Sequence, residues 1–293
     1  MRIAVTGKHG QVVSALLERG QDAGIEIIAV GRPELDLADH ASIRTVLSKI
    51  KPDVVVSAAA YTAVDKAEGE RDLAFAVNSE GPAAIAQFAG LLGIPIVHFS
   101  TDYVFPGDKQ GVYFETDATG PVSVYGQSKL AGEEGIAAAN PNHAILRTSW
   151  VYSPFGSNFV KTMLGLAETR DTLKVVADQH GTPTSALDIA DAVITIAQRL
   201  AADPDSKLRG IFHMTGSGES TWAEFAEAIF ATLFEKTGRA VSVRHITTAD
   251  YPTPAKRPAN SRLSNGKLNE IYGIFLPDWK ISTEVVLDRL LDE

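Results

Sequence analysis

The chain of 293 residues contains no cysteine. Disulfide bonds and thiolate metal sites are therefore excluded, and a reducing cytoplasm is compatible with the composition. Long hydrophobic runs are also absent, because no uninterrupted apolar stretch reaches the roughly 20 residues that a membrane-spanning helix needs. The apolar run at the N-terminus is too short for a signal peptide and ends at Gly7. We therefore expect a cytoplasmic protein without a membrane partner.

Basic residues are few, with 27 Lys and Arg against 36 Asp and Glu and a net charge of −9. Proteins that bind a nucleic-acid backbone normally present a basic face, so such a partner is disfavoured. An anionic small molecule would have to be bound by local cations. Arg257 lies in a proline-rich segment that restricts its freedom, which favours it as a ligand for a substrate phosphate. A solvated loop charge is the alternative.

The first residues predict a dinucleotide-binding unit. A buried strand over Ile3–Thr6 is followed by a glycine turn and then by apolar residues at helical spacing. In such units the helix N-terminus and bare backbone amides face a pyrophosphate. Gly7 and Gly10 fit the glycine pattern, whereas Val13 stands where a third glycine is expected. Because that glycine mainly permits close packing of helix on strand, Val13 affects packing more than phosphate contact. An ordinary strand-to-helix turn is the alternative.

The residues after the next expected strand, 25–30, bear on the identity of the cofactor. An acidic residue there favours NAD, but Arg32 stands at this place and can pair with a ribose phosphate. We therefore expect NADPH to be favoured over NADH, with a solvated surface arginine as the alternative. Asp36, next to Leu37, is expected against the adenine ring.

Strands and helices alternate along the first 150 residues. The segments 52–57 and 94–99 read as buried strands, and residues 78–92 and 124–139 read as helices. This order predicts an α/β fold with a doubly wound parallel sheet in residues 1–150, to which segments near 173–214 return. The pattern is looser afterwards, and residues 151–293 are expected mainly to form a smaller, discontinuous C-terminal substrate domain.

A Tyr-x-x-x-Lys pair carries the candidate chemistry. On a helix, the spacing of Tyr125 and Lys129 places both side chains on one face. The ammonium is expected to lower the pKa of the phenol, which suits proton transfer. Thr101, at the end of the strand 94–99, can hold a substrate oxygen, while Asp102 can orient substrate hydroxyls or cap local backbone. Spacing alone also fits a solvated tyrosine and lysine on an amphipathic helix.

Together these stretches resemble the extended short-chain dehydrogenase/reductase family over nearly the whole chain. The most specific motifs are Gly7-Lys8-His9-Gly10-Gln11 and the segments Ala58 to Glu68, Ser100 to Gly107, Tyr125 to Glu133, Arg147 to Tyr152 and Arg257 to Leu263.

The resemblance implies a Rossmann fold and a role for each matching residue. Tyr125 would be the general acid, Lys129 would hold the nicotinamide ribose and lower the tyrosine pKa, and Thr101 would complete the triad. The implied cofactor contacts are Gly10, Gln11 and Val12 with the diphosphate, Asp36 and Leu37 with the adenine, and Ala60, Tyr61 and Thr62 nearer the nicotinamide. The implied sugar pocket is lined by Val64, Tyr103 and Trp150, although Trp150 also fits ordinary core packing.

Tyr103 discriminates within the superfamily. The related sugar-nucleotide dehydratases typically carry Thr-Asp-Glu at this strand end, because elimination of water needs an additional acid and base. Thr101-Asp102-Tyr103 lacks that glutamate, so the resemblance implies a reductase of a dTDP-linked keto-sugar that uses NADPH or NADH.

Two alternatives stay open. One is a non-catalytic relative of the same fold, similar to the regulatory subunit of methionine adenosyltransferase. The other is a reductase or epimerase of another nucleotide sugar. Some relatives bind magnesium through acidic side chains between subunits, but three matching acids cannot be located here and no metal site is assigned. A homodimer is the assembly considered.

Overall fold

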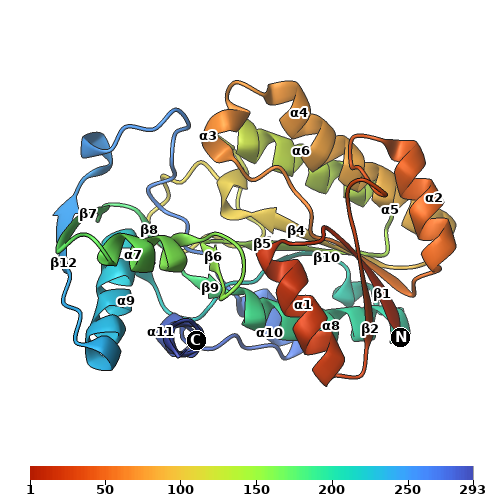
Figure 1. Ribbon diagram of the computed structural model, residues 1–293. Coiled ribbons are helices and arrows are strands. Elements are labelled where there is room, and N and C mark those ends of the chain that lie inside the picture. Colours follow the sequence, from red (N-terminus) through yellow and green to blue (C-terminus); the bar gives the residue numbers. More distant parts are fainter. Residues whose placement is uncertain (293) are drawn as a thin grey trace.

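The computed structural model describes residues 1–292 and is built around a six-stranded parallel sheet (Figure 1). The strands follow the order β10-β5-β4-β3-β1-β2. Their bounds are β1 (Arg2–Thr6), β2 (Glu26–Val30), β3 (Val54–Ser57), β4 (Ile96–Thr101), β5 (His143–Thr148) and β10 (Gly210–His213). The expected doubly wound parallel sheet is confirmed.

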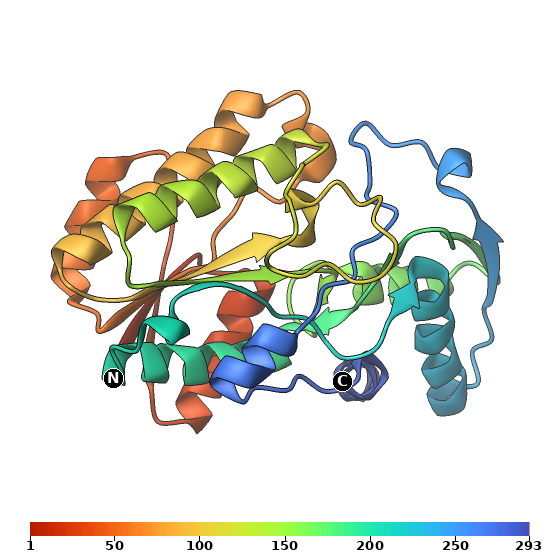
Figure 2. The ribbon, with the colours of Figure 1, turned by 180° about the vertical axis from the view of Figure 1, so that it is seen from behind.

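Helices cover both faces of this sheet, which explains its apolar strands. In β1, Ile3 and Val5 point to one face and belong to the core under the first set of helices, whereas Ala4 points to the other face. Every residue of β3 and β4 is buried, as parallel strands between two helix layers require. Helices of the first face are α1 (Gln11–Asp22), α8 (Ala186–Ala202) and α10 (Gly266–Tyr272); those of the second are α2 (His40–Ile50), α5 (Gly81–Leu91) and α6 (Val124–Ala139). Figure 2 shows the two layers from behind, on opposite sides of the sheet.

One long helical run on the second face contains a π-helical turn. It begins with α4 (Arg71–Phe75), continues through the π-helical residues Ala76–Glu80 and passes directly into α5. The helix expected over 78–92 therefore starts earlier than its apolar pattern indicated. The short helix α3 (Val64–Ala67) precedes it.

The remaining elements lie beyond the carboxyl ends of the sheet strands (Figure 1). They include three two-stranded sheets, in which β6 pairs with β9, β7 with β12 and β8 with β11. Their bounds are β6 (Val151–Tyr152), β7 (Thr172–Val176), β8 (His180–Gly181), β9 (Thr184–Ser185), β11 (Ser220–Thr221) and β12 (Ser242–Ile246), with α7 (Phe159–Ala167), α9 (Trp222–Thr237) and α11 (Trp279–Leu291) packed beside them. Helix α9 begins with a capping box formed by Thr221 and Glu224.

Later segments of the chain are divided between these two parts. Strand β10 joins the main sheet beside β5, whereas β7 pairs with β12 outside it. The division at residue 150 stays a prediction. The proline-rich residues 251–258 form no regular helix or strand, and α10 and α11 were not expected from the sequence. Within residues 1–292, no helix has the length and apolar character to cross a membrane.

Candidate active site

The site lies where the strand order reverses. From β1 the chain continues to β2 on one side, and β3 lies on the other, which leaves a crevice at the carboxyl ends of β1 and β3. The Thr6 hydroxyl oxygen accepts hydrogen bonds from the amides of Ala58 and Ala59, both at 3.0 Å, and so ties the two strand ends together. Two cavities of about 470 Å³ and 550 Å³ open there and share Gly7 and Ala60 among their lining residues. They form the two halves of one trough.

The glycine turn forms the floor between the two cavities. Gly7 has φ of +106°, a conformation that side chains rarely adopt, and its amide donates to Val30 O at 2.6 Å. Gly10 is the N-cap of α1, and no side chain caps this helix, so its first amides are presented to the cavity lined by Gly10, Gln11 and Val12. Val13 is buried, and a Cβ on Gly7 would lie 3.2 Å from its Cγ2. Val13 therefore fills the space between helix and strand and leaves the amides accessible.

The second cavity contains the residues expected at the adenosine end of a dinucleotide. Gly31, Arg32, Asp36 and Leu37 all line it. Tyr61 lines it as well, although it was expected nearer the nicotinamide. Arg32 is exposed, while the neighbouring Lys8 forms an ion pair with Glu34. The Asp36 carboxylate accepts a hydrogen bond from the Ala38 amide at 3.0 Å and so caps its own turn. Arg32 after β2 and Lys8 after β1 both line this cavity, and two cations suit a cofactor that carries an additional phosphate.

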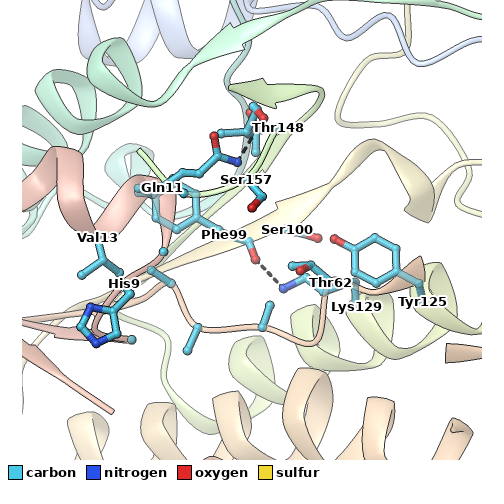
Figure 3. Close-up of a pocket in the computed structure, with 18 residues that line it drawn as sticks. His9, Gln11, Val13, Thr62, Phe99, Ser100, Tyr125, Lys129, Thr148 and Ser157 are labelled. Carbon is cyan, nitrogen blue, oxygen red and sulfur yellow. Dashed lines mark hydrogen bonds between the residues drawn. The ribbon is translucent and has the colours of Figure 1, made fainter. Parts of the chain in front are cut away.

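Ala60 and Thr62 line the first cavity together with Tyr125 and Lys129 (Figure 3). The loop that carries them is held by Asn78, whose side chain accepts from the Tyr61 amide at 2.7 Å and donates to the Tyr61 carbonyl at 3.0 Å. Asn78 also donates to Ser128 Oγ at 3.0 Å, which joins the loop to α6. Sequence reasoning missed Asn78, because it stands among other polar residues, Ser79 and Glu80, and no local pattern distinguishes it.

Lys129 is buried against the backbone of β4. Its Nζ donates to Phe99 O at 2.6 Å and lies 3.2 Å from His98 Nε2. Burial lowers the pKa of Lys129 to about 8, while the Glu133 carboxylate acts in the opposite direction. Burial and the Lys129 charge hold the pKa of His98 well below its usual range, so this histidine is neutral and can accept from Lys129.

The pKa of Tyr125 shifts in the direction opposite to the one expected. Burial raises the pKa of Tyr125 above its ordinary value, Asp102 acts in the same direction, and the Thr101 hydroxyl opposes them. The expected lowering by Lys129 is not found, because burial dominates and the ammonium is bonded to Phe99 O. The phenol is therefore protonated at neutral pH, which is the state that a proton donor needs.

Thr101 is the last residue of β4, and Asp102 follows it. The Thr101 hydroxyl donates to Asp102 Oδ1 at 2.9 Å and accepts from the Tyr103 amide at 3.2 Å. Asp102 Oδ2 accepts from the Ser261 hydroxyl, and burial raises the pKa of Asp102 to about 6. Asp102 thus links the strand end to the C-terminal segment.

Tyr103 and Arg257 contact each other next to Tyr125. The rings of Tyr103 and Tyr125 pack edge to face with centroids 5.5 Å apart. Helix α6 can come this close because Gly126 has no side chain. A Cβ there would lie only 2.3 Å from the Tyr103 carbonyl oxygen. Arg257 donates to the Tyr103 hydroxyl at 3.2 Å and forms an ion pair of 2.6 Å with Asp65, the residue after Val64.

Trp150 lies on the side of the C-terminal elements. Its ring stacks on Trp222 at 3.7 Å between centroids, and its φ is +48°. Trp222, which sequence reasoning missed, packs in turn on Phe159. Trp150, Val64, Tyr103 and Arg257 do not line the two cavities described above. They therefore lie beyond the trough that holds Tyr125 and Lys129.

Residues 1–291 match the family described as RmlD substrate binding domain. The chain belongs to this family. A dTDP-4-dehydrorhamnose reductase from Sinorhizobium fredii is 55% identical over 293 residues, which cover all of this chain and 99% of the relative. Two solved structures are also similar along almost their whole length. A dTDP-4-dehydrorhamnose reductase from Clostridium acetobutylicum has a TM-score of 0.91 at 39% identity and covers 99% of each chain.

The second structure is a dTDP-4-dehydrorhamnose reductase from Bacillus anthracis in complex with NADP. It has a TM-score of 0.90 at 33% identity and covers 98% of this chain and 99% of its own. These relatives confirm the expectation of a reductase with the extended short-chain dehydrogenase/reductase fold.

Proposed function

We propose that this protein reduces the C4 ketone of dTDP-4-dehydro-L-rhamnose to the alcohol of dTDP-L-rhamnose, with NADPH as the preferred reductant. The observation that carries the proposal is that Tyr125 and Lys129 line one cavity with the glycine turn, and that the Thr101 hydroxyl lies beside the Tyr125 phenol. The 55% identity to a named dTDP-4-dehydrorhamnose reductase supports the choice of substrate.

The trough fits a dinucleotide. Gly7, Gly10, Gln11 and Val12 border the space in which a diphosphate would meet bare amides of α1. Arg32 with Asp36, Leu37 and Tyr61 would take the adenosine end, and Ala60 and Thr62 the nicotinamide end. The complex of the Bacillus anthracis relative with NADP supports this cofactor.

The protein's own groups then handle the substrate oxygen. When bound, the reduced nicotinamide would supply a hydride for the carbonyl carbon. Thr101 would hold the carbonyl oxygen, and Tyr125 would give its proton to that oxygen as the C–O double bond becomes a single bond. Lys129 would orient the nicotinamide ribose. The Thr101-Asp102-Tyr103 sequence lacks the further acid that elimination of water would need, which favours simple reduction.

The sugar nucleotide would lie against Val64, Asp102, Tyr103 and Trp150, with Arg257 facing its diphosphate. Residues 1–150 would mainly bind the cofactor and residues 151–293 the sugar nucleotide. The net charge of −9 makes a nucleic-acid partner unfavourable.

We also propose a homodimer in the cytoplasm. The exposed apolar side chains of Phe275, Ile281 and Val285, near and on α11, support an interface between copies. Size-exclusion chromatography with light scattering measures the mass directly, and a monomer at micromolar concentration would contradict the dimer. Cell fractionation checks the location.

Tyr125→Phe tests the reaction. The variant keeps the ring but has no proton to give, so we expect kcat to fall by about 10²- to 10⁴-fold with little change in NADPH affinity. NADPH oxidation is followed by absorbance with the dTDP-keto-sugar present. The matched control is Tyr251→Phe, which removes an exposed hydroxyl far along the chain. Normal turnover of Tyr125→Phe would remove Tyr125 from the mechanism.

The same assay separates the alternatives. A non-catalytic relative would oxidise no NADPH with any keto-sugar. A reductase of another sugar would be stabilised more strongly by a different nucleotide sugar in a thermal-shift panel with NADPH present.

A further inference from the structure

We propose that Asp65 is a positioning residue, which holds Arg257 in the orientation that binds the diphosphate of the sugar nucleotide. The inference rests on the proposed function and deepens it, because Asp65 belongs to none of the motif positions to which a role was assigned.

One carboxylate holds the arginine and its backbone together. Asp65 Oδ2 pairs with Arg257 Nη2 at 2.6 Å, and Asp65 Oδ1 accepts from the Ala255 amide at 3.1 Å. The two partners lie about 190 residues from Asp65 in the sequence and two residues from each other. The bonds therefore attach the proline-rich segment around Arg257 directly to the N-terminus of α3.

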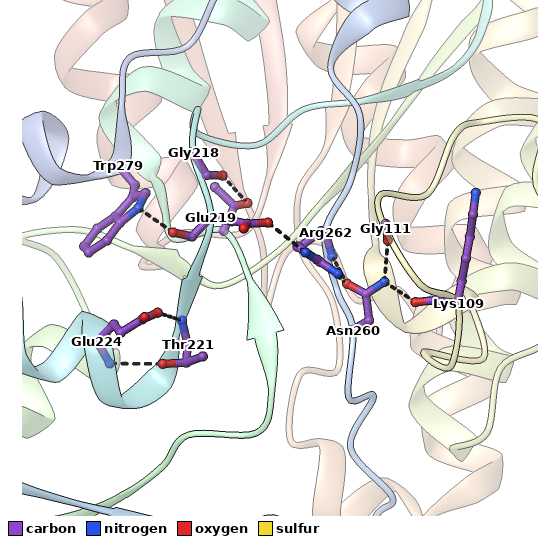
Figure 4. A network of polar contacts seen from close by, with 10 residues as sticks. Lys109, Gly111, Gly218, Glu219, Thr221, Glu224, Asn260, Arg262 and Trp279 are labelled. Atoms are coloured by element: carbon purple, nitrogen blue, oxygen red, sulfur yellow. Dashed lines mark hydrogen bonds and ion pairs between the residues drawn. The ribbon is translucent and has the colours of Figure 1, made fainter.

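The chain on the other side of Arg257 is anchored as well (Figure 4). Asn260 Nδ2 donates to the carbonyls of Lys109 and Gly111 at 2.7 Å and 2.6 Å. Arg262 pairs with Glu219 at 2.8 Å and donates to Asn260 Oδ1 at 2.9 Å. Because the segment is held at Ala255 and again at Asn260, the freedom that Arg257 keeps is mainly that of its own side chain.

Asp65 and Tyr103 restrict that remaining freedom. Arg257 Nη1 donates to the Tyr103 hydroxyl at 3.2 Å while Nη2 is paired with Asp65. In the described residues these are the hydrogen-bond acceptors of its side chain, and a planar guanidinium carries five N–H groups, so donors are left for an anion. The side chain of Arg257 is 23% exposed, which leaves it reachable.

The position of this arginine suits a sugar diphosphate. Tyr103 lies between Arg257 and Tyr125, with its hydroxyl on the guanidinium and its ring edge-on to the Tyr125 ring. In the substrate, one sugar ring separates the diphosphate from the C4 ketone, so a diphosphate at Arg257 directs the ketone toward Tyr125. An arginine pre-oriented by Asp65 loses less conformational entropy when the anion binds.

The test is a double-mutant cycle on KM for the dTDP-keto-sugar. Asp65→Asn keeps the shape of the side chain and an acceptor for the Ala255 amide but removes the charge that holds Arg257. We expect KM to rise about tenfold, with kcat and the KM for NADPH unchanged. Arg257→Ala should raise KM at least as much, and Asp65→Asn should add nothing in the Arg257→Ala background.

A matched control and a binding measurement complete the design. Asp72→Asn makes the same charge change at an exposed position in the first turn of α4, and its KM should equal that of the wild type. Calorimetric titration with dTDP should show the same loss of affinity for Asp65→Asn as KM does.

The outcomes separate the role of Asp65 from the proposed function. The inference would be overturned if Asp65→Asn had the same KM and dTDP affinity as the wild type. Effects on KM that add fully in the double variant would overturn it as well. A lower Tm without a change in KM would also overturn it, because Asp65 would then have a structural role only. If the wild type binds dTDP but does not turn over the keto-sugar, the proposed function alone is overturned. The role of Asp65 is then still tested by the dTDP affinity of Asp65→Asn. A wild type that binds no dTDP would overturn both.

Discussion

Three residues of α6, each four positions from the next, tie this helix to the candidate site and to the sheet. Tyr125 faces the cavity, Lys129 donates to Phe99 O, and Glu133 accepts from Arg147 Nε at 2.9 Å and Nη2 at 2.6 Å. Glu133 also accepts from the Ser100 hydroxyl. Because Lys129 and Glu133 are bonded to β4 and β5, any slide of α6 would leave buried charged groups unpaired. Lys129 and Glu133 thus hold Tyr125 at the strand end.

Asp102 provides a pH prediction at the same scale. Burial raises its pKa to about 6 from 3.8, so the folded protein keeps the proton over a pH range in which the unfolded chain has lost it. The free energy of unfolding should therefore fall as pH rises from about 4 to 6. Asp102→Asn removes this effect and should stabilise the protein at pH 7 by up to about 3 kcal/mol, with little gain at pH 4. Urea unfolding at both values measures the difference, and a less stable variant at pH 7 would contradict it.

Residue types with a characteristic spacing were predictable, and those without one were not. The Tyr-x-x-x-Lys spacing and the glycine turn led to Tyr125, Lys129, Gly7 and Gly10, all of which line the first cavity. Their roles stay predictions. Asp65 and Asn78 carry no local pattern, because their partners lie elsewhere in the fold.

At the scale of elements, the π-helical turn between α4 and α5 is the unusual feature. It carries Asn78, whose side chain satisfies both backbone groups of Tyr61 and bonds Ser128. A π-turn inserts an extra residue into a helix and so re-aims a side chain. Here it directs a buried side-chain amide at the loop that borders the trough.

Asn78→Ala should leave the Tyr61 amide and carbonyl without their partner in a partly buried place. We expect a loss of about 2 kcal/mol in the free energy of unfolding, together with weaker NADPH binding, because the loop 60–62 loses its support. Chemical denaturation and calorimetric titration measure the two effects. Ser79→Ala, in the same turn, serves as the control and should change neither. Unaltered stability of Asn78→Ala would show that the loop is held by other contacts.

At the scale of the whole molecule, the two ends of the chain pack on the same core. Trp279, Val286 and Leu287 of α11 are buried with residues of α1 and α9. The Trp279 carbonyl accepts from the Tyr152 hydroxyl at 3.2 Å, and Arg289 pairs with Glu18 at 2.7 Å. Helix α11 is thus part of the common core although it ends the chain.

Removing the residues from Trp279 onward should prevent stable folding. The truncation exposes an apolar surface of α9 and deletes several fully buried side chains, each of which contributes about 2 to 5 kcal/mol. Circular dichroism melting of the soluble fraction measures the result. Removal of the last two residues alone should leave Tm nearly unchanged. A cooperative melt of the longer truncation near the wild-type Tm would contradict the expectation.

The sequence by itself determined the order of strands and helices around the parallel sheet and the identity of the glycine turn and the tyrosine–lysine pair. These features are encoded by apolar period and by spacing within one element, so neighbouring residues suffice to predict them. Only the tertiary structure decided the partner of Arg257 and the raised pKa of Tyr125. Both depend on burial and on contacts between elements, and the Asp65–Arg257 pair joins residues 192 positions apart. No local pattern can specify such a pair, because the fold alone brings its members together.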